Sequence, residues 1–320
     1  MKVTKVTLIL GILLIFLTIG AVSATDINNT VTDSGNTTIT DTNSAVDVSS
    51  NPVTTVSNAQ AVSNVQTATS SKSYNITNDS YATYFDESGN IKNTSGISSG
   101  DTINIGNING KNFIITTPLT ITSMNSTSVL SNGTITLSTG SDGSTITGLT
   151  LISNTTSGIT VYSSNNTITK NNIEIGGNNS YAIMAVGGDN NIITYNTINM
   201  NGINPYTYAI DIGASWTDGT ATKGYSIKGN NITANIDNNY VAGIYSSGLI
   251  NSEIADNYFA LSSNKFVYGI ATSNNWGLTN TTGNITISKN KVIGLGEMVY
   301  LIETFKNTEM TITGNNLSGI

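Results

Sequence analysis

The chain has 320 residues, a formal net charge of −7, only 10% charged residues, no Cys and no His, and all 12 of its basic residues are Lys. Disulfides and thiolate metal sites are therefore excluded, and an acidic chain without Arg lacks the basic face that a nucleic-acid partner requires. The length is ample for burying a core, and the abundance of Thr, Ser, Asn and β-branched residues favours a β protein.

The first 24 residues read as a signal peptide. Lys2 and Lys5 precede a continuous apolar run, and residues 22–24 (Val-Ser-Ala) supply the small side chains that a signal peptidase requires at its cleavage site. The alternative is an uncleaved anchor, because the apolar run approaches the ~17–20 residues that span a bilayer. Either way the rest of the chain is exported, which predicts a location outside the cell or on its surface.

Composition divides the remainder at about residue 72. Residues 25–72 lack aromatic side chains and any sustained period, so they are predicted to be a disordered spacer that cannot bury enough apolar surface to become ordered. Residues 73–100 bring the first aromatic residues and are predicted to cap the N-terminal end of the domain that follows. Residues 101–320 alternate Thr or Ser with Ile or Leu in short runs between Gly, Asn and Ser turns, which is typical of strands with one buried face.

One sequence frame recurs six times in this last segment. It consists of an apolar residue, two variable residues, Asn, one variable residue and a second apolar residue, as in ITKNNI at 168–173. The recurring asparagines are spaced 25, 34, 27, 33 and 25 residues apart. They are Asn171, Asn196, Asn230, Asn257, Asn290 and Asn315. Self-similarity of this length indicates a solenoid.

A second motif keeps step with the asparagines and usually combines Tyr, a small residue and Ile. Its tyrosines are Tyr181, Tyr208, Tyr268 and Tyr300, and Ala242 interrupts their phase. Two coils are longer than the others and carry insertions at 214–224 and 274–284, each with a tryptophan six residues after its motif Ile. These tryptophans are Trp216 and Trp276.

Coils of about 25 residues with two or three short strands predict an all-β, right-handed parallel β-helix. Each strand would pair with its equivalent one coil along, about 4.8 Å away, so equivalent residues stack into columns. Asn adopts the left-handed conformation of tight corners more readily than most residues, and stacked amides can hydrogen-bond from coil to coil. We therefore expect the six asparagines to form a structural ladder at a corner, flanked by two inward columns of apolar residues.

The repeat frame resembles the right-handed parallel β-helix repeats of the pectin-lyase-like superfamily, and GDTINI (100–105) and STITGLTLISN (144–154) look like its opening coils. The leader, the spacer, YFDESGNI (84–91) and the Asn-rich coils together resemble the adhesin-like surface proteins of methanogenic archaea. The chain stops inside a coil at residue 320, so we expect a fragment of a longer protein, a truncated gene product, or a partner that covers the last rung.

The resemblance requires a search for an active site, because the superfamily includes polysaccharide lyases and glycoside hydrolases. Its lyases use an Arg or Lys base with an acidic Ca²⁺ cluster, and its hydrolases use an Asp-Asp pair and a His. This chain has no Arg, His or Asp-Asp dipeptide.

The two candidates for a catalytic carboxylate are Asp211 and Asp218. A glycosidase pair requires two carboxyls ~5–9.5 Å apart, but the carboxylate in the column of Asp211 is Glu303, three coils away and roughly 14 Å by strand spacing. Asp218 could fold back toward Asp211, although the matching insertion at 274–284 has no carboxylate. The sequence therefore favours a protein that is not an enzyme.

Calcium has little support in the sequence. The turns GSDGS (140–144) and GGDNN (187–191) could each supply one or two oxygen ligands, whereas Ca²⁺ takes six to eight. We expect ordinary turns there and no cofactor. Asp256 and Lys289 stand at equivalent positions of neighbouring coils and are expected to form an exposed ion pair of little energetic worth.

The aromatic residues are the strongest candidates for ligand binding. Tyr181, Tyr208, Tyr268 and Tyr300, with the tryptophans of the two insertions, could form a platform for sugar rings or for a partner protein. Alternatively, the tyrosines stack as structural steps and the tryptophans fold over the edge of a coil.

Together these observations predict a non-enzymatic, adhesin-like surface protein, a β-helical stalk that contacts extracellular glycans or cell-surface proteins. The alternative is a polysaccharide lyase or glycoside hydrolase acting near Asp211. A purely structural envelope component is a third interpretation. Contact with a membrane is expected only through the leader, if it stays uncleaved.

Overall fold

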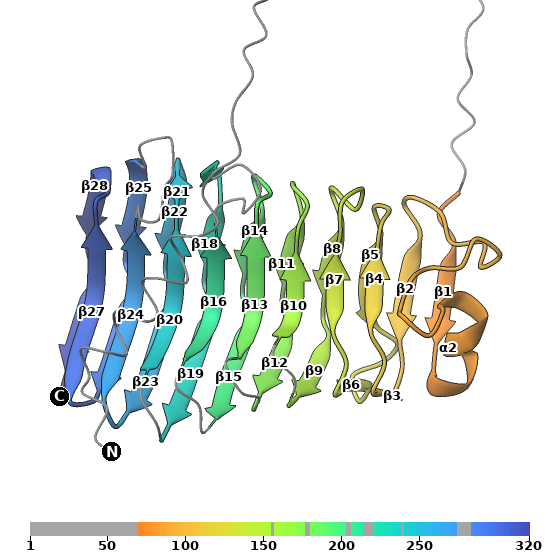
Figure 1. Ribbon diagram of the computed structural model, residues 1–320, viewed down its shortest axis with the longest axis horizontal. Helices are drawn as coiled ribbons and strands as arrows, with labels where there is room; N and C mark the ends of the chain where they lie inside the picture. The colour runs from red at the N-terminus through yellow and green to blue at the C-terminus, as the bar shows by residue number, and fades with distance from the viewer. Residues whose placement is uncertain are drawn as a thin grey trace, which may run out of the picture. The chain divides into compact units, whose positions relative to one another are not determined.

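A computed structural model describes residues 70–154, 157–176, 180–202, 206–213, 220–237, 240–273 and 283–320. These residues form three long parallel sheets, and successive strands of the chain visit the three sheets in turn. Figure 1 shows the coils stacked along the long axis of this unit, from β1 at one end to β28 at the other. The predicted fold class, an all-β right-handed parallel β-helix, is confirmed.

The sheets are numbered here in the order in which each coil visits them. Sheet 1 contains β1 (Ser73–Ile76), β2 (Thr102–Ile105), β5 (Thr120–Ser123), β8 (Thr145–Thr147), β11 (Thr167–Thr169), β14 (Ile192–Thr194), β18 (Ser226–Lys228), β22 (Ser252–Ala255), β25 (Gly283–Ser288) and β28 (Thr308–Thr313). Sheet 2 contains β3 (Ile108–Asn109), β6 (Val129–Ser131), β9 (Thr150–Ser153), β12 (Asn172–Ile175), β15 (Thr197–Gly202), β19 (Asn231–Ile236), β23 (Tyr258–Ser263), β26 (Lys291–Leu295) and β29 (Asn316–Gly319). Sheet 3 contains β4 (Phe113–Ile115), β7 (Ile135–Leu137), β10 (Ser157–Val161), β13 (Tyr181–Val186), β16 (Thr207–Gly213), β20 (Tyr240–Ser247), β24 (Phe266–Ser273) and β27 (Met298–Phe305). A further pair, β17 (Thr222–Lys223) and β21 (Leu249–Ile250), stands apart from the three sheets.

The register of the sheets stacks equivalent residues, as the repeat frame predicts. In sheet 1, Ile168 pairs with Ile193, which pairs with Ile227. In sheet 2, Ile173 pairs with Ile198 in the same way. These side chains are fully buried, and burying a side chain of this size contributes about 1.5–3 kcal/mol. Both predicted inward columns are therefore confirmed by the strand pairing.

The corner between sheets 1 and 2 is held by the asparagine column. The Asn230 side chain donates from Nδ2 to Oδ1 of Asn257 (2.9 Å) and to the backbone carbonyl of Ile193 (2.9 Å). Its Oδ1 accepts from both the backbone N–H and Nδ2 of Asn196, each at 3.0 Å. Both donors and both acceptor positions of the amide are thus used, although the side chain is almost completely buried.

The left-handed residue of this corner is not the asparagine but the residue before it. Lys170, Tyr195, Asp256 and Lys289 have φ between 55° and 57°, and Gly229 has φ of 64°. The sequence argument that the asparagine itself supplies this conformation was therefore wrong. The physical reason is that two adjacent residues have separate roles. The preceding residue makes the turn, and the asparagine amide points inward and hydrogen-bonds between coils.

A second hydrogen-bonded column stands at the corner between sheets 3 and 1. Asn166 donates from its backbone N–H and from Nδ2 to Oδ1 of Asn191, at 2.8 and 3.0 Å. Asn191 in turn donates to the hydroxyl of Tyr225 (2.9 Å), whose backbone N–H donates to Oγ of Ser252 (2.9 Å). Each of these residues lies five positions before a ladder asparagine, a regularity that the first frame did not include.

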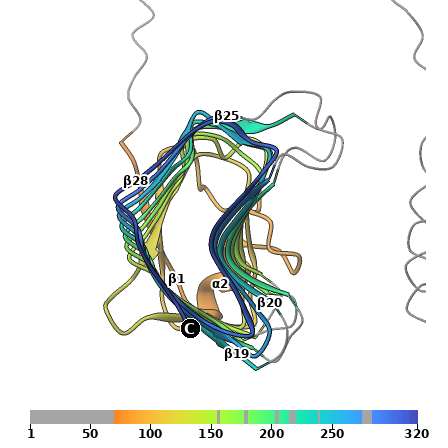
Figure 2. The ribbon, with the colours of Figure 1, turned by 90° about the vertical axis from the view of Figure 1, so that its left-hand side faces the viewer.

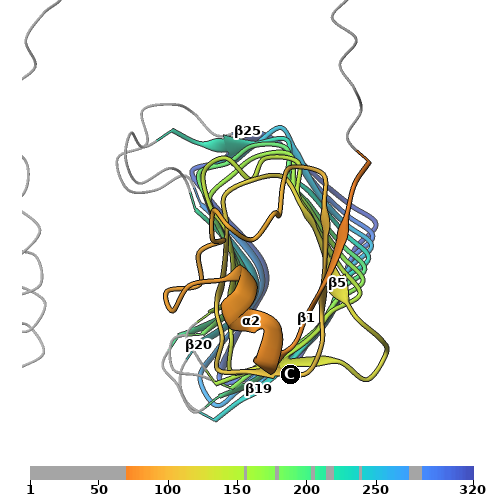
Figure 3. The same cartoon turned by 90° about the vertical axis from the view of Figure 1, so that its right-hand side faces the viewer.

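The helix α2 (Asn78–Tyr84) lies against the first coils of the solenoid, as Figures 1 and 3 show. It begins with a capping box between Thr77 and Ser80. Tyr81 and Phe85 pack edge-on against Phe113, with ring centroids 5.4 and 4.9 Å away. These rings belong to the same buried cluster as the isoleucine columns, so α2 extends the core at its N-terminal end.

The predicted leader and most of the predicted spacer lie outside the described residues. Within the described part of the chain, no helix has both the length and the apolar character needed to span a bilayer.

Replacing a ladder asparagine tests the role of the column. We expect Asn230→Ala to lower the free energy of unfolding by about 2–4 kcal/mol, because it leaves the backbone N–H and one of the two Nδ2 hydrogens of Asn196 buried without an acceptor. The measurement is denaturant unfolding followed by far-UV circular dichroism. Asn235→Ala is the matched control, because Asn235 is exposed on sheet 2 and should change stability by less than about 0.5 kcal/mol. Equal effects of the two substitutions would contradict a stabilising ladder.

Candidate functional site

The outer face of sheet 3 carries the predicted tyrosines. The pairing places Tyr181 beside Tyr208, Tyr208 beside Ala242, and Tyr268 beside both Ala242 and Tyr300. The end views show that this sheet, which contains β20, bends inward, so that its outer face is concave (Figures 2 and 3). The tyrosine column therefore lies along the concave face of the solenoid.

The rings of this column follow one another without a gap despite the alanine. Tyr181 and Tyr208 stack with centroids 5.5 Å apart, and Tyr268 and Tyr300 stack at 4.9 Å. Tyr240, two residues before Ala242, fills the gap, with its centroid 5.9 Å from Tyr208 and 4.5 Å from Tyr268. The small side chain at 242 leaves the space that the Tyr240 ring occupies. We call these five rings the tyrosine run.

Parts of this aromatic surface remain open to solvent. Tyr300 is 39% exposed, and Tyr206, whose ring lies 5.7 Å from that of Tyr240, is 52% exposed. Tyr268, by contrast, is only 9% exposed. The tyrosine run is therefore both a packed structural stack and a surface that a ligand can contact, and the two interpretations of the sequence do not exclude each other.

Asp211 lies in the column next to the tyrosine run. Its neighbours across the strands are Met184 and Tyr245, and the ring of Tyr245 lies 5.2 Å from that of Tyr208. The side chain is half-buried, and among the described residues its carboxylate has no hydrogen bond or ion pair. Burial raises the pKa of Asp211 from 3.8 to about 7. Burial, and secondarily the nearby Asp211 charge, raise the pKa values of Tyr181 and Tyr208.

A second carboxylate at catalytic distance is not found in the described part of this column. Glu303 stands three strands along, after Tyr245 and Ala271, which is roughly 14 Å by strand spacing. The paired carboxyls of a glycosidase lie ~5–9.5 Å apart. Asp218, the other candidate, falls outside the described residues, as do Trp216 and Trp276.

A hollow of about 600 Å³ lies at the end of this face, lined by residues that include Tyr162, Val186, Asp189 and Thr220. It adjoins the column of Asp211, because Val186 pairs with Gly213, two residues beyond Asp211.

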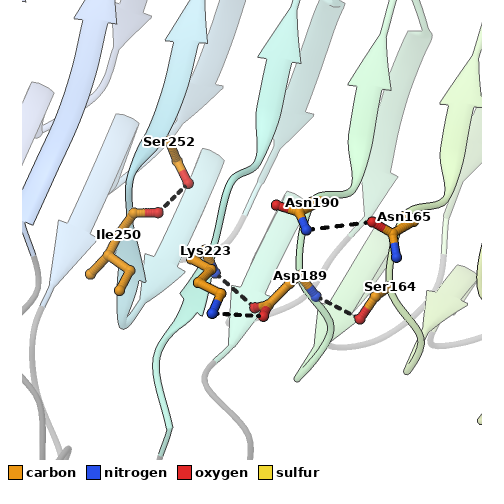
Figure 4. A network of polar contacts seen from close by, with 7 residues as sticks. All are labelled: Ser164, Asn165, Asp189, Asn190, Lys223, Ile250 and Ser252. Carbon is orange, nitrogen blue, oxygen red and sulfur yellow. Dashed lines mark hydrogen bonds and ion pairs between the residues drawn. The ribbon is translucent and has the colours of Figure 1, made fainter. Parts of the chain in front are cut away.

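The wall of this hollow is a polar network of turns (Figure 4). Asp189 Oδ1 accepts from the backbone N–H of Lys223 (3.1 Å), and Oδ2 lies 3.6 Å from Lys223 Nζ. The backbone N–H of Asp189 donates to Ser164 Oγ (3.0 Å), and the backbone N–H of Ser164 donates to Asp142 Oδ1 (2.9 Å). The two aspartates weighed for calcium therefore bond from turn to turn.

No group of three or more acidic, His or Cys side chains that could hold a metal ion occurs among the described residues. The expected ion pair between Asp256 and Lys289 is absent from the described ion pairs, which join Lys228 to Glu253 (2.6 Å) and Lys223 to Asp189 (3.6 Å). That expectation was wrong; both residues occupy the left-handed corner position described above.

Sequence reasoning missed Tyr240, Tyr245 and Phe266, which pack beside Ala242 on this face. A signal was present in the sequence, since the coil that lacks a motif tyrosine carries one two positions earlier. The pKa of Asp211 had no comparable signal, because its burial depends on side chains from neighbouring coils.

The fold and this face together define the class as a parallel β-helix with an aromatic concave sheet. No protein-family model and no curated protein matches the chain. Among solved structures, the chain is similar to an alginate lyase from Paenibacillus sp. str. FPU-7, with 10% identity and a TM-score of 0.33. The match covers 77% of this chain and 99% of the lyase chain. A similarity at this level says nothing about the ligand or the chemistry of this chain.

Substituting Asp211 should change stability in a pH-dependent way. The folded protein keeps a proton on Asp211 that the unfolded chain releases between pH 3.8 and about 7, so this carboxyl lowers stability progressively over that range and fully above it. We expect Asp211→Asn to raise the free energy of unfolding by roughly 1–3 kcal/mol at pH 8, and by nothing at pH 3.5.

Thermal unfolding of both proteins over a pH series measures this effect. Glu253→Gln is the control, because Glu253 is a half-buried acid on sheet 1 that already pairs with Lys228; it should not show a gain that grows with pH. A gain for Asp211→Asn that is independent of pH would contradict burial of the carboxylate.

Proposed function

We propose that the protein is an exported, adhesin-like surface protein without enzymatic activity, and that it binds glycans on the concave face of sheet 3. The observation that carries this proposal is the tyrosine run, five adjoining rings that cross neighbouring coils with part of their surface exposed. A polymer lying across the strands would meet one ring after another.

Sugar rings suit such a surface for a physical reason. Tyrosine offers a flat apolar face and a hydroxyl, so one side chain both packs and hydrogen-bonds. The rings of the tyrosine run are also held by their neighbours, which reduces the conformational entropy lost when a ligand binds. The hollow beside Tyr162 and Asp189 provides a polar recess at the end of the same face.

The proposed location follows from the sequence of the leader, with the spacer holding the solenoid away from the envelope. Glycans of neighbouring cells or surface proteins would be its partners, with no nucleic acid and no cofactor. The resemblance of the coils and leader to adhesin-like proteins of methanogenic archaea supports the same proposal.

The second candidate is a polysaccharide lyase or hydrolase acting at Asp211. The observation that favours it is the raised pKa of this carboxyl, about 7, which suits a general acid or base near neutral pH. The distance to Glu303 and the absence of Arg and His from the chain count against it. A non-enzymatic binding protein is therefore the better-supported candidate.

Binding of the full chain to a glycan and polysaccharide array tests the proposal. We expect a bound glycan whose affinity falls about tenfold or more in Tyr208→Ala, because the substitution removes a ring from the middle of the face. Tyr258→Ala on sheet 2 is the matched control and should bind like the wild type. No binding by a folded sample would contradict the proposal.

The same panel separates the two candidates. Turnover of any polysaccharide that is lost in Asp211→Asn, with the fold intact by circular dichroism, would establish the enzyme instead. We expect binding without turnover.

A further inference from the structure

The charge of sheet 3 restricts what its outer face can bind. The six strands β10, β13, β16, β20, β24 and β27 contain two ionisable acids, Asp211 and Glu303, and no lysine. The Lys–acid pairs of the described residues lie elsewhere, at Lys223–Asp189 and Lys228–Glu253. The strands that carry the tyrosine run are thus purely acidic.

Asp211 lies near the rings of Tyr181 and Tyr208, whereas Glu303 lies near that of Tyr268. It stands between Met184 and Tyr245 in register, in the column next to Tyr208. Among the described residues nothing donates a hydrogen bond to its carboxylate and no lysine pairs with it. A half-buried carboxylate without a partner is costly, so a ligand that brings a donor or a positive charge gains from it.

We propose, building on the proposed glycan-binding function, that the ligand is a glycan with free amino groups. One protonated amine would pair with Asp211 while the adjoining sugar rings lie on Tyr181 and Tyr208. The ring faces reinforce this preference, because an ammonium group is attracted to the face of a tyrosine ring. Charge complementarity selects the partner here more than it adds affinity.

The same charges exclude polyuronates. A carboxylated sugar over this face would meet Asp211 and Glu303 with no lysine from the sheet 3 strands to neutralise it. Repulsion between the glycan and these acids is screened over about 10 Å at 0.1 M salt, so it acts at contact distance under ordinary conditions. The face therefore favours a cationic polymer over an anionic one.

The test compares three oligosaccharides by isothermal titration calorimetry with the full chain at neutral pH. They are a β-1,4-linked glucosamine hexamer, the same hexamer fully N-acetylated, and an oligouronate of equal length. We expect the amine form to bind about tenfold more tightly than the acetylated form, and the oligouronate not to bind. The preference should shrink as salt is added.

Asp211→Asn identifies the residue responsible. It should reduce the preference for the amine form to within about twofold, while binding of the acetylated hexamer is retained. Glu253→Gln removes one negative charge from a different face and is the matched control, so its preference should equal that of the wild type. Circular dichroism confirms that both variants are folded.

Four outcomes would contradict the amine proposal or the proposed function. Equal or tighter binding of the acetylated hexamer, still lost in Tyr208→Ala, would overturn the amine proposal and leave the glycan-binding function standing. Tight binding of the oligouronate would overturn it as well. If Asp211→Asn kept the full preference for the amine form over the acetylated form, Asp211 would not be part of the site and the amine proposal would be overturned. No binding of these or any other glycan would overturn the proposed function itself.

Discussion

The asparagine column at the corner between sheets 1 and 2 is the interaction on which the rest of the structure depends. Each interior amide of the column, as at Asn230, uses both donors and both acceptor positions between coils, so a shift of one coil by a single residue would break four bonds at once. The column therefore fixes the register of every strand that follows it. Because parallel strands pair equivalent residues, a fixed register turns every repeated side chain into a column, and the tyrosine run is a consequence of that order.

Stacking also explains how the tyrosine run tolerates a missing member. Ala242 alone would leave a gap in the surface, but the ring of Tyr240 lies only 4.5 Å from Tyr268 and bridges to Tyr208. In this coil the tyrosine stands at position 240 and the small residue at position 242. The ring of Tyr240 still lies between the rings of the neighbouring coils. The rings are consequently not evenly spaced along the face. Asp211 lies where the rings of Tyr208 and Tyr245 are close to each other. That crowding, rather than any charged neighbour, is what raises the pKa of the carboxyl.

Much of the fold could be predicted from spacing alone, because a solenoid makes long-range contacts depend on a local repeat. The frame around Asn171 predicted the corner and both isoleucine columns, and the second motif predicted the phase of the tyrosines. The left-handed residue at 170 could not be assigned, since Lys, Tyr, Asp and Gly all occupy that position. The column through Asn166 and Asn191 was missed because Tyr225 and Ser252 continue it with different chemistry. Ring packing around Asp211 depends on side chains from neighbouring coils, which no single repeat reveals.

The spacing of equivalent residues in a column also bears on whether a parallel β-helix can carry a catalytic carboxylate pair. Each column offers one residue per coil, so two groups in adjacent coils stand about 4.8 Å apart and those two coils apart about 9.6 Å. These spacings bracket the separations used by retaining and inverting glycosidases. The column of Asp211 instead holds Met184 and Tyr245 on either side and Ala271 next but one. An acid at any of these three positions would complete a carboxylate pair over the tyrosine run. Among the described residues, Asp211 thus has no second carboxylate at these spacings in its column, and it lies beside the aromatic surface of the tyrosine run.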